Sequence, residues 1–144
     1  WVCATPELVT AVRTSKQFLT YVSGGPFQYA IAEGLNLGDD YFRSLADGLR
    51  ERRDRLSAGL ANAGFDVWNS AGTYFVTTHL ASMGTDDGVA FCWSLPERCG
   101  VVAVPSVVFY DSKDTGRPLV RFACCKRPEV IAEAAERLAT LRSG

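Results

Sequence analysis

The chain has 144 residues, with 47% hydrophobic and 22% charged side chains and a formal charge of −1 at pH 7. These proportions are typical of one ordinary globular domain. The small net charge gives no general attraction to nucleic acid or to an anionic membrane surface. No apolar run approaches the ~20 residues that span a bilayer. We therefore expect neither a nucleic-acid partner nor a membrane partner.

The cysteines and the first residue bear on where the protein works. The five cysteines, at positions 3, 92, 99, 124 and 125, are an odd number without a C-x-x-C spacing. This pattern argues against a disulfide scaffold and favours a reducing, cytoplasmic compartment, with the cysteines as small core residues. Because the opening Trp-Val-Cys-Ala is typical of the middle of a buried strand, we expect the chain to be a piece of a longer protein.

The first part of the chain is predicted to be mostly helical after a short strand over residues 1–4. Thr5, Pro6 and Glu7 are typical of a helix start, because they supply a capping hydroxyl, a fixed φ and a favourable charge. The expected helices cover about residues 6–19, 27–35 and 39–63, separated by breaks at 23–26 and 36–38. The first helix is expected to bury Leu8, Val12 and Phe18.

The third helix is long and amphipathic. Its apolar residues recur at steps of three, four and seven: Phe42, Leu45, Leu49, Leu56 and Leu60. Gly48 and Gly59 each cost about 1 kcal/mol against alanine, so we expect another backbone to come close there. The basic run at 50–55 contains interleaved acids and predicts a solvated helix face in preference to an RNA-binding patch.

The second part of the chain is predicted to alternate strand, strand, helix, strand, strand and helix. The expected strands cover about residues 65–68, 73–78, 101–104 and 118–124, with a turn through 69–72. The expected helices begin at Asp86 or Asp87, ending near Leu95 before Pro96, and at Pro128, ending near Leu141. Residues 111–116 are expected to form a mobile polar loop. This alternation predicts an α/β fold in which helices cover one face of a sheet.

The sequence PLVRFACCKRPE, residues 118–129, contains the most promising binding residue. Val120 and Phe122 alternate with Arg121, so on a strand the arginine projects from the opposite face. A guanidinium held in this way could clamp a carboxylate or a phosphate, because it presents a rigid fork of donors. An edge-strand arginine in water is the alternative, and the residues alone favour that alternative.

Other candidates for catalysis are few. His79 is the only histidine and has no acidic or cysteine partner at a ligand spacing, so we expect a structural role and no metal site. None of Lys16, Lys113 and Lys126 lies in a setting that favours Schiff-base chemistry. The sequence contains no Walker A or G-x-G-x-x-G motif. From these residues alone, no enzymatic activity can be assigned.

Several segments, taken in order, resemble the C-terminal half of class I pyridoxal-phosphate aminotransferases, which have fold type I. The segments are WVCATPELVTAVRTSKQFLTYVSGGPFQYAIAEGL, RRDRLSAGLANAGFDVWNSAGTYFV, VVAVPSVVFYD and LVRFACCKRPEVIAEAAERL. The patterns GTYF at 72–75 and VRF at 120–122 are short, but their joint order and spacing are specific. The most similar branch contains the kynurenine, methionine and N-succinyldiaminopimelate aminotransferases.

The resemblance implies roles for several residues. The equivalent of Arg121 binds the α-carboxylate of the amino-acid substrate. Tyr21 matches a position where family members place an aromatic ring into the neighbouring subunit's active site, with helix-end packing as the alternative. Tyr74 and Phe109 lie in segments near the family's substrate entrance. The lysine that forms a Schiff base with pyridoxal phosphate, and the residues that hold this cofactor, are expected upstream of Trp1, so the chain alone is expected to be inactive.

The resemblance also implies an organisation and an activity. Residues 1–38 are expected to complete the large cofactor-binding domain, 39–64 to form a connecting helix and 65–144 to form a small α+β domain. The whole protein is expected to be a cytoplasmic homodimer that moves an amino group from an amino acid to a 2-oxo acid in amino-acid biosynthesis. The N-succinyldiaminopimelate reaction is one candidate. A non-enzymatic α/β module that binds a small carboxylate and a β-lyase on the same scaffold are the alternatives.

Overall fold

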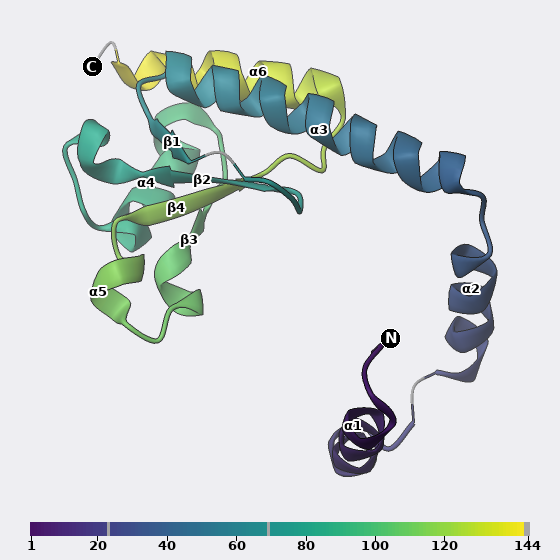
Figure 1. The fold of residues 1–144 in the computed structure, drawn as a ribbon. Coiled ribbons are helices and arrows are strands. Elements are labelled where there is room, and N and C mark those ends of the chain that lie inside the picture. Colours follow the sequence, from purple (N-terminus) through teal and green to yellow (C-terminus); the bar gives the residue numbers. More distant parts are fainter. Residues whose placement is uncertain (23, 69, 143–144) are drawn as a thin grey trace. The chain divides into compact units, whose positions relative to one another are not determined.

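The computed structural model describes residues 1–22, 24–68 and 70–142. The predicted breaks at 23–26 and 69–72 each include one residue outside this described part. The chain divides into two compact units, Trp1–Phe42 and Arg43–Gly144. Figure 1 shows the elements of each unit.

The described residues of the first unit form helices with nearly the predicted bounds, and no strand occurs among them. Its helices are α1 (Pro6–Leu19), α2 (Gly25–Leu35) and the first residues of α3 (Asp39–Asn62). Residues 1–4 form no strand, and the Trp1 side chain is 83% exposed. The predicted burial of Leu8, Val12 and Phe18 is also wrong, because all three are exposed in this unit. So short a unit has little surface with which to cover its own apolar side chains.

The second unit is a four-stranded antiparallel sheet with helices packed on one face. The sheet has the order β1-β2-β4-β3, formed by β1 (Asp66–Trp68), β2 (Phe75–His79), β4 (Leu119–Ala123) and β3 (Val104–Pro105). Its helices are α4 (Gly88–Cys99), α5 (Lys113–Gly116), α6 (Pro128–Ala139) and most of α3, with 3-10 turns η1 (Leu80–Met83), η2 (Ser106–Phe109) and η3 (Thr140–Arg142). The predicted α/β fold class is confirmed.

The core lies between the sheet and helices α3, α4 and α6. Its side chains are at most 9% exposed, and they include Leu56, Leu60, Phe65, Val76, Leu95, Val120, Phe122, Ile131 and Leu138. Helices α3 and α6 lie side by side (Figure 1), and a Cβ added at Gly59 would be 2.5 Å from the Cβ of Ala135. The predicted close approach is therefore confirmed at Gly59. It is wrong at Gly48, which meets only the Arg52 side chain, at 3.9 Å.

Helix α4 continues past the predicted end. Asp87 caps its first turn by accepting hydrogen bonds from the backbone N–H groups of residues 89 and 90, at 3.0 and 2.9 Å. The predicted stop before Pro96 is wrong, because the helix runs to Cys99 and ends at Gly100, whose φ is +69°. Pro96 removes one helical hydrogen bond. The fully buried Leu95 side chain anchors this turn in the core and offsets that loss.

Two other segments differ from the prediction. The expected buried strand at 101–104 is wrong in extent, since only Val104 and Pro105 pair with β4 and Val102 is 76% exposed. Pro105 has no N–H to donate, which suits this short edge strand. The expected polar loop at 111–116 contains the helical turn α5.

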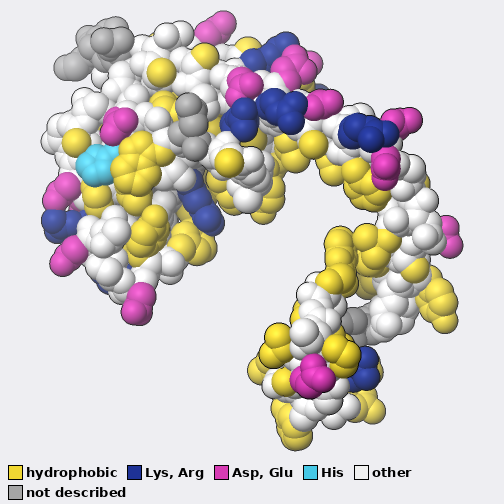
Figure 2. Space-filling model, viewed as in Figure 1, with side chains coloured by type: hydrophobic (Ala, Val, Ile, Leu, Met, Phe, Trp, Pro, Cys, Tyr) yellow, Lys and Arg dark blue, Asp and Glu magenta, His cyan; other side chains and the backbone are white. Residues whose placement is uncertain are grey.

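Charges of both signs alternate along the exposed face of α3 (Figure 2). Arg50 pairs with Asp47 at 2.7 Å and Arg55 pairs with Glu51 at 2.5 Å, and all four side chains are more than half exposed. Such pairs contribute only a few tenths of a kcal/mol each. The prediction of a solvated face at 50–55 is confirmed.

The cysteines are divided between core and surface. Cys92 and Cys124 are buried as predicted, whereas Cys3 and Cys125 are exposed, which corrects the prediction that the cysteines pack in the core. Within the described ranges, no helix is both long and apolar enough to cross a bilayer.

Candidate functional site

Arg121 lies on an inner strand of the sheet. Its strand, β4, is between β2 and β3, and Arg121 is opposite Thr77 on one side and Val104 on the other. The neighbouring Val120 and Phe122 side chains are 0% and 3% exposed in the core. The arginine therefore emerges from the face without packed helices. The predicted alternation is confirmed, and the edge-strand alternative is wrong.

Two phenylalanine rings contact the guanidinium group of Arg121. Its Cζ atom lies 3.6 Å from the ring centroid of Phe109 and 4.2 Å from that of Phe75. Phe75 belongs to β2, where it shares the face of Arg121, and Phe109 is the last residue of η2. A cation–π contact stabilises by about 0.5–1 kcal/mol at an exposed site and by about 2 kcal/mol when water is excluded.

The guanidinium has no hydrogen-bond or ion-pair partner among the described residues. Its Nε atom is buried and unpaired, whereas neither terminal nitrogen is buried in this way. Leaving a buried donor unpaired costs about 1–3 kcal/mol, so the arrangement requires a reason. Arg117, in comparison, pairs with Asp86 at 2.5 Å. The free donors of Arg121 form the planar fork that matches a carboxylate.

Of the predicted substrate-binding tyrosines, Tyr74 lies beside this site. Its ring centroid is 4.6 Å from that of Phe75, and the side chain is 46% exposed. Tyr21 belongs to the other unit, where its φ is +59° and its side chain is 79% exposed. The structure therefore brings Phe109 to Arg121 and Tyr74 to the neighbouring Phe75 ring, while the substrate-binding roles of Tyr74 and Tyr21 stay predictions.

His79 has the structural role that the sequence predicts. Its Nδ1 atom accepts a hydrogen bond from the backbone N–H of Ala81 at 3.1 Å and so caps η1. Its ring also stacks on Trp68, with 5.9 Å between centroids and 30° between planes. In the part of the chain that the structure describes, no group of three or more His, Cys, Asp or Glu side chains could hold a metal ion.

The three lysines do not fit a covalent bond to a cofactor. Lys16 donates to the hydroxyl of Thr20 at 2.7 Å on an exposed helix face, and Lys126 is exposed. Lys113 donates to two backbone carbonyls, at 2.8 and 3.3 Å. A lysine nucleophile needs a desolvated or cation-flanked site that lowers its pKa. Among the described residues, none of these three lysines is in such a setting, and the position of the lysine that binds pyridoxal phosphate stays a prediction.

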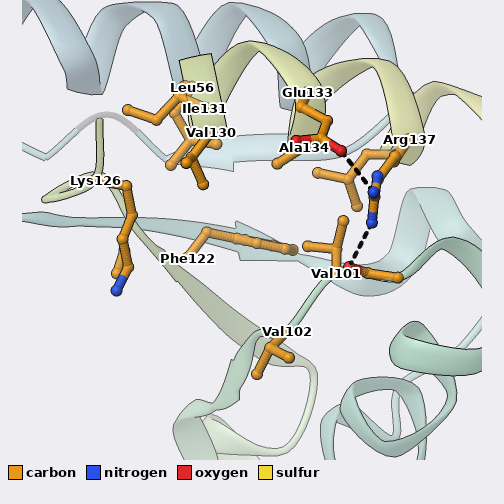
Figure 3. A pocket seen from close by; sticks show the side chains of 13 residues that line it. Leu56, Val101, Val102, Phe122, Lys126, Val130, Ile131, Glu133, Ala134 and Arg137 are labelled. Carbon is orange, nitrogen blue, oxygen red and sulfur yellow. Dashed lines mark hydrogen bonds and ion pairs between the residues drawn. The ribbon is translucent and has the colours of Figure 1, made fainter. Parts of the chain in front are cut away.

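A separate pocket of about 280 Å³ lies on the helix side of the sheet (Figure 3). Apolar side chains of α3 and α6 line it, and Arg137 crosses one end by donating to Glu133 and to the carbonyl of Gly100. Phe122 also lines this pocket, while the adjacent Arg121 emerges from the other face. The pocket is thus not part of the Arg121 site.

Phe75 is the site residue that sequence reasoning missed. The GTYF pattern contains it, and two-residue alternation along β2 places it on one face with Thr77. The pairing of Thr77 with Arg121 is what brings its ring to the guanidinium. A strand register between distant segments cannot be read from one sequence, so no local signal identified this contact.

Known proteins resemble the chain over nearly all of its length. The N-succinyldiaminopimelate aminotransferase DapC of Mycobacterium tuberculosis, described as probable, is 44% identical over 98% of this chain and 38% of its own length. The methionine aminotransferase of Escherichia coli is 31% identical over 96% of this chain and 36% of its own length. The chain therefore spans little more than a third of the length of these relatives.

Solved structures of aminotransferases also match nearly all of this chain and about a third of their own length. The N-succinyldiaminopimelate aminotransferase structure from Mycobacterium tuberculosis has a TM-score of 0.85 and 46% identity, covering 96% of this chain and 36% of that one. The structure of Escherichia coli YbdL, for which a methionine aminotransferase function is described, has a TM-score of 0.76 and 31% identity, covering 90% of this chain and 34% of that one. The family described as aminotransferase class I and II matches residues 1–138. The chain belongs to this family.

Proposed function

We propose that the full-length protein is a pyridoxal-phosphate-dependent aminotransferase in which Arg121 binds the α-carboxylate of the substrate. The observation that carries this proposal is the guanidinium of Arg121, which two aromatic rings hold without any acidic partner among the described residues. The 44% identity to a probable N-succinyldiaminopimelate aminotransferase supports N-succinyldiaminopimelate as the amino donor or product.

The part of this chain in the reaction is to bind and orient the substrate. Pyridoxal phosphate supplies the electron sink for transamination when it is bound, and in this proposal mainly residues outside this chain hold it. A bidentate pair between Arg121 and the α-carboxylate fixes both the position and the direction of the substrate. This pair therefore sets where the α-amino group lies, which is the positioning that a transfer reaction needs.

We propose that the full-length protein is a cytoplasmic homodimer. Residues 1–38 complete the large domain, 39–64 connect the domains and 65–144 form the small domain, with Tyr21 reaching the neighbouring subunit's active site. The exposed apolar side chains of α1, such as Phe18 at 87%, support this arrangement because they fit a surface that other parts of the protein cover. Light scattering on the full-length protein tests the dimer.

The proposed role of Arg121 is tested in full-length protein loaded with cofactor. We expect Arg121→Ala to lower kcat/KM for the amino donor about 10- to 150-fold, since a hydrogen bond to a charged group contributes about 1.5–3 kcal/mol. Arg121→Lys should recover only part of the loss, because ammonium cannot make the bidentate pair. The visible absorbance of the bound cofactor should not change in either variant.

Arg117→Ala is the matched control, because Arg117 is an exposed arginine already paired with Asp86. A near-normal kcat/KM in Arg121→Ala would contradict the proposal. Product analysis separates amino transfer from β-elimination. A full-length protein that takes up no pyridoxal phosphate would instead be a carboxylate-binding module.

A further inference from the structure

We infer that Phe75 and Phe109 are positioning residues, which hold the Arg121 guanidinium in place for a carboxylate while leaving its N–H donors free. This inference rests on the proposed function, because it assigns further residues to the same site. It adds two aromatic side chains to the carboxylate site and explains why the arginine has no acidic partner there.

The type of contact is the first argument. An acidic side chain could also hold an arginine, but it would occupy the donors that a substrate carboxylate needs. An aromatic ring interacts with the face of the guanidinium through its electron-rich π-system and offers no acceptor in the guanidinium plane. The five N–H groups of Arg121 lie in that plane. Ring contacts at 3.6 and 4.2 Å therefore fix the group without competing with a ligand.

The way in which the Phe75 ring is held is the second argument. Phe75 lies on β2 opposite Ala123 of β4, so the same backbone ladder that carries Arg121 fixes its position. The Tyr74 ring packs against it at a tilt of 40°. Phe75 thus contacts the arginine from within the sheet, and its backbone is paired with β4.

The support beneath Phe109 is the third argument. Gly116 of α5 packs so closely on the preceding turn that an added Cβ would lie 2.8 Å from the Cα of Val107 and 2.9 Å from the Cβ of Tyr110. Lys113 ties the same turn by donating to the carbonyls of Val107 and Tyr110 at 3.3 and 2.8 Å. Phe109 lies between those two residues, so the α5 segment holds the backbone that presents its ring.

The expected consequence is an effect on binding more than on the chemical step. A free arginine side chain loses much rotamer freedom when it binds a ligand, and prior ordering reduces that cost. Removing a ring should therefore raise KM for the amino donor and leave kcat nearly unchanged. A cation–π contact of the usual strength corresponds to a change of about 2- to 30-fold.

The experiment compares four variants of the full-length, cofactor-loaded protein. Phe75→Leu and Phe109→Leu keep an apolar side chain but remove the ring, whereas Phe109→Tyr keeps the ring. Trp93→Leu is the control, because it removes an 80% exposed aromatic side chain from α4. For each variant, KM and kcat for the amino donor and the inhibition constant of succinate, a carboxylate without an amino group, are measured.

The inference predicts that both leucine variants raise KM and the succinate inhibition constant by about 2- to 30-fold, with kcat nearly unchanged. Phe109→Tyr, which keeps the ring, should recover most of the loss seen in Phe109→Leu, and Trp93→Leu should behave like the wild type. Phe109 is 58% exposed, so Phe109→Leu decides the question if Phe75→Leu fails to fold. Unchanged constants in Phe109→Leu, or a fall in kcat alone, would overturn the inference. If the constants are unchanged in Phe109→Leu while Arg121→Ala is impaired, only the inference about the rings is overturned. If Arg121→Ala is also normal, the proposed function is overturned as well.

Discussion

The two faces of the sheet in the second unit have opposite characters, although the same strands form both. On the helix side, Val120 and Phe122 are packed to 0% and 3% exposure among apolar side chains. On the other side, Arg121 has an unpaired, buried Nε atom and contacts two phenylalanine rings. Neighbouring residues in the middle of this strand, Val120 to Phe122, therefore serve stability and binding separately.

This difference shows how a small sheet can carry a binding group that its own core does not satisfy. The helix side gains free energy from burial of apolar area, at roughly 25 cal/mol per Å². The face that carries Arg121, called the open side below, tolerates an unpaired N–H donor that costs about 1–3 kcal/mol. The comparison predicts that changes on the helix side lower stability and that changes on the open side lower substrate affinity.

The strongest test of this separation is Phe122→Ala, on the helix side. Truncation of a buried phenylalanine should lower the free energy of unfolding by about 3–5 kcal/mol, through lost burial and a residual cavity. Calorimetry of the full-length protein should show a lower Tm for the transition that includes the second unit. At a temperature where the variant is folded, kcat/KM should stay within about threefold of the wild type. A large loss of kcat/KM at unchanged Tm would contradict the separation.

A second test on the helix side is Gly59→Ala, where α3 meets α6. The helical preference of alanine would contribute up to about 1 kcal/mol, but overpacking costs about 1–3 kcal/mol. Because the new Cβ would lie 2.5 Å from the Cβ of Ala135, the second effect should dominate and the Tm should fall.

Two controls isolate the clash at Gly59. Adding Ala135→Gly to Gly59→Ala should recover part of the lost stability, because it removes the facing methyl group. Gly48→Ala in the same helix should stabilise slightly, since an added Cβ there meets only the Arg52 side chain, at 3.9 Å. An equal loss in Gly48→Ala would show that the backbone, and not the contact with α6, determines the effect.

On the open side, Lys113→Met should have a smaller effect and should change binding. The lysine donates to the carbonyls of Val107 and Tyr110, on either side of Phe109. Loss of these exposed hydrogen bonds, at about 0.5–1.5 kcal/mol each, should loosen the ring and raise KM about two- to fivefold. Lys126→Met, at an exposed lysine outside this turn, should change neither KM nor Tm. An unchanged KM in Lys113→Met would show that the turn keeps its shape without the lysine.

Local chemistry explains what the sequence could predict of the fold. The start of α1 at Pro6, the cap of α4 at Asp87 and the alternation around Arg121 depend on residues close together in the chain. The errors came from distant contacts. Helix α4 passes Pro96 because Leu95 is buried in the core, and residues 111–116 form a turn because they pack on η2.

For the candidate site, too, the sequence could predict what depends on neighbouring residues but not what depends on distant contacts. Arg121 could be located from the alternation of its strand, and its role came from the resemblance to a family. Its aromatic partners could not be located together, because Phe75 reaches it through the register of β2 on β4 and Phe109 through a turn after β3. A single sequence contains neither the register nor the path of that turn.

The smallest effect that the comparison predicts is at the end of β4, where two adjacent cysteines should differ in reactivity. Cys124 continues the buried series of Val120 and Phe122, whereas Cys125 is exposed. Burial raises the pKa of the Cys124 thiol, as it raises that of Cys92 to about 11. Since the thiolate is the reactive form, a raised pKa leaves less of it at pH 8 and moves its reaction to higher pH.

Iodoacetamide labelling of the full-length protein at pH 8, followed by peptide mass spectrometry, should therefore modify Cys125 at least about tenfold faster than Cys124. In urea the two rates should converge, because unfolding removes the burial that separates them. Equal rates in the native protein would mean that the helix side of β4 opens to solvent at its last residues. The sharp division between the two faces would then end before Cys124.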